Sequence, residues 1–240
     1  MLDRYLNVHT EVQKSIYSRS PVIALDSSSL FNNIPYPRNI EVANNISKII
    51  RNNGCIPATI AVINGVLKVG LTQEDIAVIS MIKNLKIVNP SELPYVILNK
   101  LTGTTTLASS IKIASLSNII MLSTNNIESI SDIESIIYSN VSVVYNNISK
   151  NLDDINTMDY LYSKGVTIID SKSYCSDKIS NIIKIKSDLN LNRSTLISTD
   201  ISSSNLSNED SIIKTLYHNA ELASKIASNL LTIKKHKFTH

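Results

Sequence analysis

Short apolar runs rich in β-branched residues alternate with segments of helical periodicity along most of the chain. This alternation predicts a layered α/β domain with a largely parallel sheet, because parallel neighbours need a crossover that a helix usually provides. The chain has no internal repeat and no linker, so residues 1–240 are expected to form a single α/β domain. The predicted strands include residues 22–25, 118–122, 141–145 and 166–169. The predicted helices include residues 1–20, 40–52, 125–139, 152–163 and 212–231, and residues 232–240 are predicted to form a basic tail.

Two local signals are strong. Asn64-Gly65 stands between two β-rich runs, which is the most specific short-range signature of a hairpin. Thr72 with Asp75 three residues later is typical of a capping box, so a helix is expected to begin there.

The central stretch, residues 92–118, joins a short apolar run to a glycine, three threonines and a helical pattern. The threonines stand where the helix is expected to begin, after Gly103. One interpretation is an ordinary N-capped helix. The other is an anion site, because the amides and the positive end of a helix dipole point outward at such a turn.

Composition and charge exclude several classes of protein. The net charge of +3 permits contact with nucleic acid, but no concentrated basic patch argues for it. Cys55 and Cys175 lie far apart and have no spacing typical of a zinc site. No apolar run reaches the roughly 18 residues of a membrane span, and charged residues interrupt any signal-peptide core. We expect a cytoplasmic protein without membrane contact.

Several blocks of sequence resemble the pseudouridine-5′-phosphate glycosidases. The resemblance covers most of residues 21–170 and 212–230, and it implies a three-layer α/β/α fold with a largely parallel mixed sheet. It also implies a trimer and reversible cleavage of the C–C bond between uracil and ribose 5-phosphate. The family uses a Schiff-base lysine, an acidic proton donor, a divalent metal such as Mn²⁺ and a phosphate pocket. The matching blocks are residues 24–28, 35–39, 53–61, 65–71, 93–96, 103–109 and 219–227.

Position by position, the resemblance implies a proton donor at Asp26, where the family has a glutamate. The family's nucleophilic lysine falls on Ser149, with Lys150 one place further along. A second family lysine falls on Ile87, and Lys86 is again one place away. An offset of one residue turns a helical side chain by about 100° and a strand side chain to the opposite face. Neither lysine is therefore a direct substitute.

The resemblance also implies ligand contacts. Glu128 and Asp132 stand where the family has a metal and substrate loop, and they either bind a hard cation or form a solvated helix face. Thr105, Thr106 and Asn219 match the family. They either cap a helix and pack in the core, or they still contact phosphate and sugar. The substrate-binding candidates are Thr105, Thr106, Leu107, Asp132 and Asn219.

Two functions remain open at this point. The favoured hypothesis is an inactive member of the family that is kept as a binding module, because the altered catalytic groups act as a unit. Its partner would be a phosphate-bearing nucleotide, a protein or an RNA-containing assembly such as the ribosome, with no cofactor. The alternative is an active glycosidase that uses Asp26 as proton donor, Lys150 as nucleophile and Mn²⁺.

Overall fold

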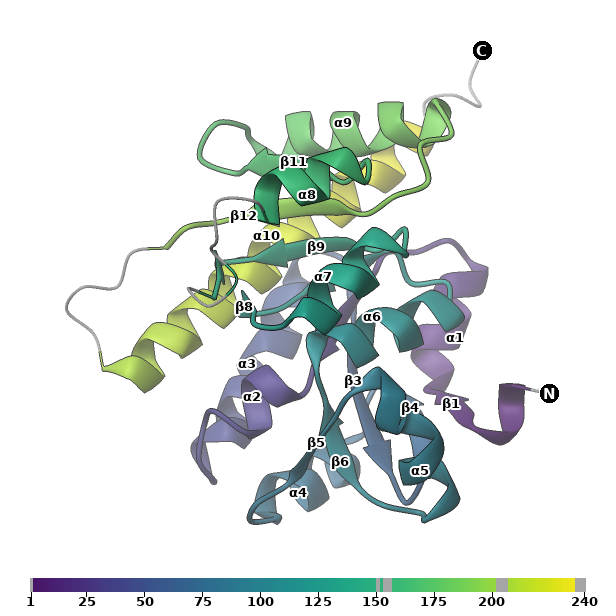
Figure 1. The fold of residues 1–240 in the computed structure, drawn as a ribbon, viewed down its shortest axis with the longest axis vertical. Coiled ribbons are helices and arrows are strands. Elements are labelled where there is room, and N and C mark those ends of the chain that lie inside the picture. Colours follow the sequence, from purple (N-terminus) through teal and green to yellow (C-terminus); the bar gives the residue numbers. More distant parts are fainter. Residues whose placement is uncertain (1, 150–151, 153–156, 202–206, 236–240) are drawn as a thin grey trace.

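The computed structural model describes residues 2–149, 152, 157–201 and 207–235 (Figure 1). Its strands are β1 (Leu6–Val8), β2 (Val22–Asp26), β3 (Ile56–Ile63), β4 (Val66–Val69), β5 (Lys86–Val88), β6 (Gly103–Thr105), β7 (Met121–Ser123), β8 (Asn126–Ile127), β9 (Ser142–Tyr145), β10 (Asn147–Ile148), β11 (Thr167–Asp170) and β12 (Thr195–Ser198). Its α-helices are α1 (Thr10–Tyr17), α2 (Ser28–Phe31), α3 (Arg38–Asn52), α4 (Gln73–Met81), α5 (Leu93–Leu98), α6 (Leu107–Leu116), α7 (Ile130–Ile137), α8 (Thr157–Ser163), α9 (Ser176–Asp188) and α10 (Asn208–Lys235). Short 3-10 turns are η1 (Leu2–Arg4) and η2 (Pro90–Glu92).

Parallel pairing dominates the main sheet. The strand order is β1-β4-β3-β2-β7-β9-β12-β11, with β6 also beside β3 and β5 beside β6. From β3 to β11 in that order all neighbours are parallel, whereas β4 and β6 run antiparallel to β3. The predicted largely parallel mixed sheet is therefore confirmed.

Helices cover both faces of this sheet and bury a separate apolar layer on each. One layer gathers side chains from α1, α5, α6, α7 and α8. The other gathers side chains from α2, α3, α4, α9 and α10. In Figure 1, α6 and α7 stand in front of the sheet and α10 crosses behind it. The α/β/α architecture predicted from the resemblance is confirmed.

The long helix α10 lies against the centre of the sheet because its buried face is built from small residues. Ala220 and Ala223 are fully buried and Ala227 nearly so, and they recur at helical spacing. Small side chains let the helix axis approach β7 and β9 closely. No helix in the described part of the chain is both long and apolar enough to cross a membrane.

Most of the predicted elements are present. Residues 22–25 form β2, and the hairpin predicted around Asn64-Gly65 is confirmed, with both turn residues at positive φ. The capping box predicted at Thr72 is confirmed with Asp75 as its partner. The apolar run at residues 93–98 forms helix α5, and the helix predicted from residue 107 is α6.

The prediction of one helix over residues 1–20 is wrong. Residues 6–8 form strand β1 instead, which pairs in parallel with β4, and only Thr10–Tyr17 is α-helical. The edge of β4 offers unpaired backbone groups, and pairing with them outweighs the local helical periodicity.

Two boundaries near the C-terminus also differ. Helix α10 continues to Lys235, so the tail predicted at residues 232–240 begins with helix, and residues 236–240 lie outside the described residues. Residues 172–211 carry a weak pattern, yet they contain α9 and β12.

Gly103 is needed where β5 and β6 approach each other. A Cβ at this position would lie 2.5 Å from the carbonyl oxygen of Lys86 and 2.8 Å from a methyl of Val88. Its φ is not positive, so the constraint is space and not backbone conformation.

We expect Gly103→Ala to lower the free energy of unfolding by about 3 kcal/mol, because the new methyl overpacks a site bounded by backbone. The matched control is Gly54→Ala, where φ is +74° but the nearest atom is 3.9 Å away. That variant carries only the left-handed backbone cost, about 1 kcal/mol. Urea unfolding measures both. Equal losses would contradict the packing argument.

Candidate active site

A small cavity lies where the parallel strands end. It encloses about 130 Å³ between the end of β2, α2, β5, the segment after β7 and the starts of α6 and α7. This edge of a parallel sheet is where α/β proteins usually bind ligands. Among its lining residues are five of the sequence-predicted site residues: Asp26, Thr106, Leu107, Glu128 and Asp132.

Asp26 is the buried acid of this cavity. Its Oδ2 accepts hydrogen bonds from the Ser28 hydroxyl at 3.1 Å and the Ser29 amide at 3.0 Å. Its Oδ1 is buried and has no hydrogen-bond partner among the described residues. Burial raises the pKa of Asp26, and the neighbouring polar groups of Ser29, Thr124 and Ser28 lower that pKa only in part. This environment favours the protonated carboxyl, which can act as a proton donor.

Asp132 joins the N-termini of two helices. Its Oδ1 accepts the Ala108 amide of α6 at 2.8 Å. Its Oδ2 accepts the amides of Glu128 at 3.1 Å and Ser129 at 2.9 Å, which precede α7. Asp132 also completes a capping box with Ser129. The carboxylate of Asp132 therefore already occupies the positive end of α6.

The turn at residues 103–106 is an N-cap rather than an open phosphate loop. The Thr106 side chain caps the Ser109 amide, and the Thr106 amide bonds the carbonyl of Val88. The Thr105 amide is bonded to the Ser27 hydroxyl. Together with the Asp132 contact, these bonds engage four amides around the turn, those of Thr105, Thr106, Ala108 and Ser109, but not that of Leu107.

Thr105 and Asn219 lie beneath the cavity and not on its wall. The Thr105 hydroxyl donates to the carbonyl of Ile60 at 2.7 Å. The Asn219 amide donates to the carbonyl of Thr124 and accepts from the Thr199 hydroxyl, each at 2.8 Å. Both side chains are fully buried. They hold the strand ends in place, so their role in this structure is positioning.

The acidic residues do not fit a metal site. Within the described ranges, no group of three His, Cys, Asp or Glu side chains could hold an ion. Both oxygens of Asp132 are engaged by backbone amides. Desolvation by neighbouring protein atoms, then the charges of Asp26 and Asp132, raise the pKa of Glu128. The metal expected at Glu128 and Asp132 is not supported by this donor set.

The structure places no lysine in the cavity wall at the two positions where the family has its lysines, Ile87 and Ser149. Ile87 lines the cavity, whereas Lys86 forms a salt bridge with Glu92 at 2.6 Å. The Ser149 amide donates to the carbonyl of Ile127 at 2.8 Å, just after β10. Lys150, the predicted nucleophile, lies outside the described residues.

The sequence analysis missed several polar residues of this cavity. Ser28, Ser29 and Thr124 surround Asp26, and Asn33 and Asn126 also line the wall. The serines directly after the buried strand β2 could have indicated them, because ligands of α/β proteins bind where the parallel strands end.

Comparison with known proteins identifies the family. The model of the family described as indigoidine synthase A like protein matches residues 11–210. This chain belongs to that family. A pseudouridine-5′-phosphate glycosidase of Clostridium botulinum is 36% identical over 182 residues, covering 70% of this chain and 59% of the relative. One from Staphylococcus aureus is 35% identical over 179 residues, covering 70% and 58%. The predicted resemblance is confirmed, and the chain spans under two thirds of the length of these relatives.

Two solved structures share the fold of this chain. The prealnumycin C-glycosynthase AlnA, solved in complex with ribulose 5-phosphate, superposes with a TM-score of 0.84 at 19% identity. That match covers 98% of this chain and 99% of the other. An indigoidine synthase A-like protein from Thermotoga maritima gives 0.79 at 14% identity, covering 94% and 96%. At these identities the likeness establishes the fold alone.

Asp132→Ala should lower the free energy of unfolding by about 3 kcal/mol, because it leaves the buried Ala108 amide unpaired and removes a helix cap. The control is Glu134→Ala on the same helix, whose carboxylate bonds the exposed Tyr160 hydroxyl. Its expected cost is about 0.5 kcal/mol. Thermal unfolding compares the two, and similar shifts would contradict the bridging role of Asp132.

Asp26→Asn should change stability in a pH-dependent way. The raised pKa of Asp26 means that its contribution is fully present below the unfolded carboxyl pKa, about 3.9, and is lost as pH rises through the folded pKa. The asparagine amide of the variant does not ionise, so the variant does not lose stability in this way as pH rises. The variant should therefore melt higher than the wild type at pH 8, with the difference shrinking toward pH 4.

The comparison variant is Glu11→Gln, because a hydrogen bond from Arg51 lowers the pKa of Glu11. Its stability difference should have the opposite sign at neutral pH and vanish as pH falls through the folded pKa. A difference for Asp26→Asn that does not change with pH would refute the burial argument.

Proposed function

We propose that this chain cleaves the C–C glycosidic bond of pseudouridine 5′-phosphate in the Asp26 cavity, giving uracil and ribose 5-phosphate. The observation that carries the proposal is the Asp26 carboxyl, which is buried, unpartnered at Oδ1 and part of the cavity wall. A buried carboxyl oxygen without a partner lowers stability and has no structural use, so its presence supports a chemical role. The names of the curated relatives and the sugar phosphate held by one solved neighbour agree with this substrate class.

In the proposed reaction, the carbon leaving group of uracil must gain a proton as the bond to the sugar breaks. Asp26 would donate that proton as a general acid. The carboxylate left behind would be stabilised by the Ser28 hydroxyl and the Ser29 amide, which already bond its Oδ2. The family's Schiff-base lysine is assigned to Lys150, whose amine would supply the electron pair that forms a C=N bond at the sugar carbon as the C–C bonding pair leaves with uracil. No metal takes part in this scheme.

The phosphate also needs a cation. The described residues that line the cavity include no Lys or Arg. At the start of α6, the Ala108 amide is already bonded to Asp132. A cation for the phosphate would therefore have to come from outside these described lining residues.

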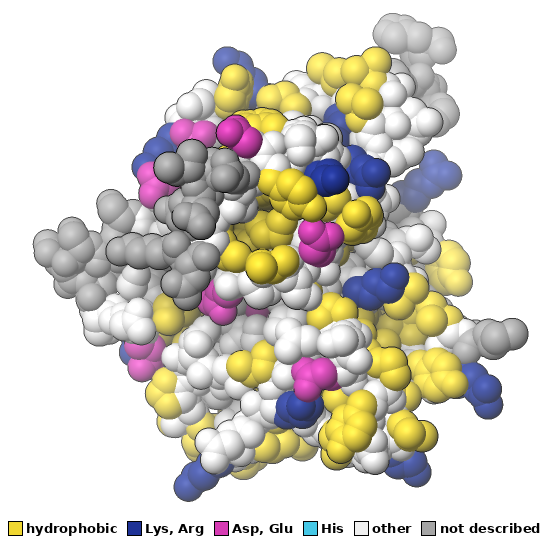
Figure 2. Space-filling model, viewed as in Figure 1, with side chains coloured by type: hydrophobic (Ala, Val, Ile, Leu, Met, Phe, Trp, Pro, Cys, Tyr) yellow, Lys and Arg dark blue, Asp and Glu magenta, His cyan; other side chains and the backbone are white. Residues whose placement is uncertain are grey.

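A non-catalytic binding role is the second candidate, favoured by Ile87 in the cavity wall. Docking on RNA has less support. Of the four lysines between residues 172 and 186, three are engaged or buried: Lys172 pairs with Asp200, Lys184 pairs with Asp188, and Lys186 is buried. On the face drawn in Figure 2, Lys and Arg side chains are spread out and do not form one patch.

The test is uracil release from pseudouridine 5′-phosphate by the purified chain, with and without Mn²⁺. We expect release by the wild type and a loss of about 100-fold or more in Asp26→Asn, because the general acid is removed. The control is Asp170→Asn, an exposed acid that ends strand β11 outside the cavity. It should retain the wild-type rate.

Borohydride with ribose 5-phosphate should trap an adduct on Lys150 if the active scheme is right. No release and no adduct, with a melting temperature raised by ribose 5-phosphate, would support the binding role instead. Wild-type release that Asp26→Asn leaves unchanged would remove Asp26 from the mechanism.

A further inference from the structure

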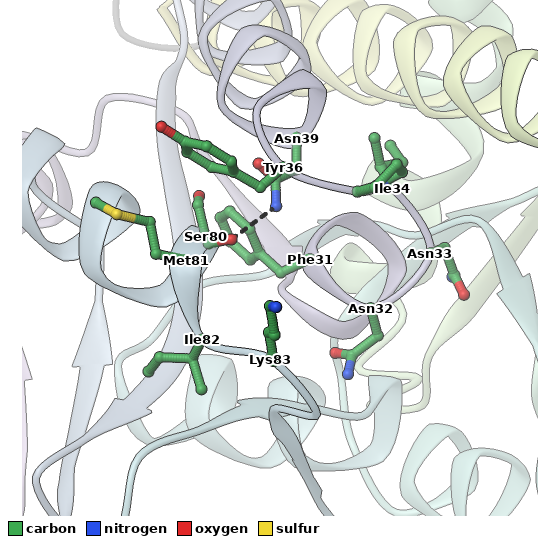
Figure 3. A pocket seen from close by; sticks show the side chains of 11 residues that line it. Phe31, Asn32, Asn33, Ile34, Tyr36, Asn39, Ser80, Met81, Ile82 and Lys83 are labelled. Carbon is green, nitrogen blue, oxygen red and sulfur yellow. Dashed lines mark hydrogen bonds between the residues drawn. The ribbon is translucent and has the colours of Figure 1, made fainter.

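A second cavity adjoins the first across helix α2. It encloses about 620 Å³, and it shares only Asn32 and Asn33 with the lining of the Asp26 cavity. Its walls come from α2, the turn before α3, and the end of α4 with the residues that follow. This volume is within the range of small-molecule sites in proteins. Figure 3 shows Asn39, Ser80 and Lys83 arranged around the ring of Phe31.

Two residues that line this cavity each carry a buried polar atom without a partner among the described residues. Asn39 is 2% exposed and Ser80 is 6% exposed, and both side chains line the cavity. Neither the Asn39 Oδ1 nor the Ser80 Oγ has a hydrogen-bond partner among the described residues. The Asn39 Nδ2 donates to the backbone carbonyl of Ser80 at 3.4 Å, which places Oδ1 as the free acceptor of that amide. Unpaired buried polar atoms destabilise a fold, and two in one cavity indicate a missing ligand.

The two atoms provide a complementary pair. An amide oxygen accepts a hydrogen bond, and a serine hydroxyl can donate one. A ligand N–H would suit the Asn39 oxygen, and a ligand C=O would suit the Ser80 hydroxyl. The aromatic ring of Phe31 and the buried side chain of Ile34 provide apolar surface for the body of such a ligand.

The charge around the cavity favours an anion. Lys83 is exposed, lines the cavity and forms no salt bridge with any described residue. None of the lining residues is acidic. A carboxylate on the ligand would therefore meet a cation and no opposing negative charge.

We propose that this cavity binds a lactam carboxylate, a planar ring with adjacent N–H and C=O groups and an acidic substituent. The N–H donates to Asn39 Oδ1, the C=O accepts from the Ser80 hydroxyl, and the carboxylate pairs with Lys83. The site is separate from the Asp26 cavity and does not depend on the glycosidase reaction.

The probe is 6-hydroxynicotinate, which in its lactam form carries the N–H and C=O side by side with the carboxylate across the ring. Calorimetric titration should show binding to the wild type and a loss of about tenfold in Ser80→Ala, the scale of one hydrogen bond. Ser80→Ala removes only an unpaired hydroxyl, so the fold should be as stable as the wild type or more so. Benzoate, which keeps the ring and the acid but lacks the N–H and C=O pair, should bind at least tenfold more weakly.

Two further variants separate the contributions. Lys83→Gln should weaken binding and remove its salt dependence, because salt screens the ion pair. Asp26→Asn should bind the probe like the wild type. No binding to the wild type at millimolar probe would overturn the proposal. A probe that binds Ser80→Ala normally but is lost in Asp26→Asn would also overturn it, because it would place the ligand in the other cavity.

Discussion

The carboxylate of Asp132 holds one wall of the candidate active site together. It accepts three backbone amides, one at the start of α6 and two ahead of α7. Charge-assisted bonds of this kind are stronger than neutral ones, and here they are buried. The contact packs α6 against α7 and thereby shapes the cavity behind Asp26. It also places the negative charge of Asp132 at the positive end of the α6 dipole. A phosphate group at that helix end would compete with Asp132 for the Ala108 amide.

The carboxyl of Asp26, unlike that of Asp132, is only partly hydrogen-bonded. Strand β2 is buried along its whole length, and its last residue carries a carboxyl of which one oxygen is satisfied and the other is not. The flanking strands β3 and β7 keep that carboxyl away from bulk solvent. Two carboxylates in one cavity therefore have different roles that follow from their partners. Asp132, with three amides, serves structure, and Asp26, with an unpaired oxygen, remains available for proton transfer.

Much of this arrangement could be predicted from sequence, and the exceptions have physical causes. Local signals were reliable where one residue type has a specific backbone role, as at Asn64-Gly65 and Thr72. They failed at residues 6–8, where pairing with the edge of β4 overrides periodicity. Asp26, Glu128 and Asp132, three candidates taken from the family resemblance, line one cavity, but sequence spacing could not reveal that an amide from another helix engages Asp132. The orphaned atoms of Asn39 and Ser80 depend on the meeting of α3 with α4, so no local pattern could have shown them.

Helix α2 is the wall between the two cavities, and it is rigid for a reason visible in its contacts. At its start, Ser28 and Ser29 hold the Asp26 carboxyl. Just after its end, Asn32 donates to the carbonyl of Leu85 at 3.1 Å and accepts from the Thr104 hydroxyl at 2.6 Å. These bonds tie the short helix to the loop before β5 and to β6. A substitution at Ser80 therefore acts on a side chain that the wall separates from Asp26, and effects at the two sites should add independently. That independence allows the chemistry at Asp26 and the binding at Asn39 and Ser80 to be judged separately in one protein.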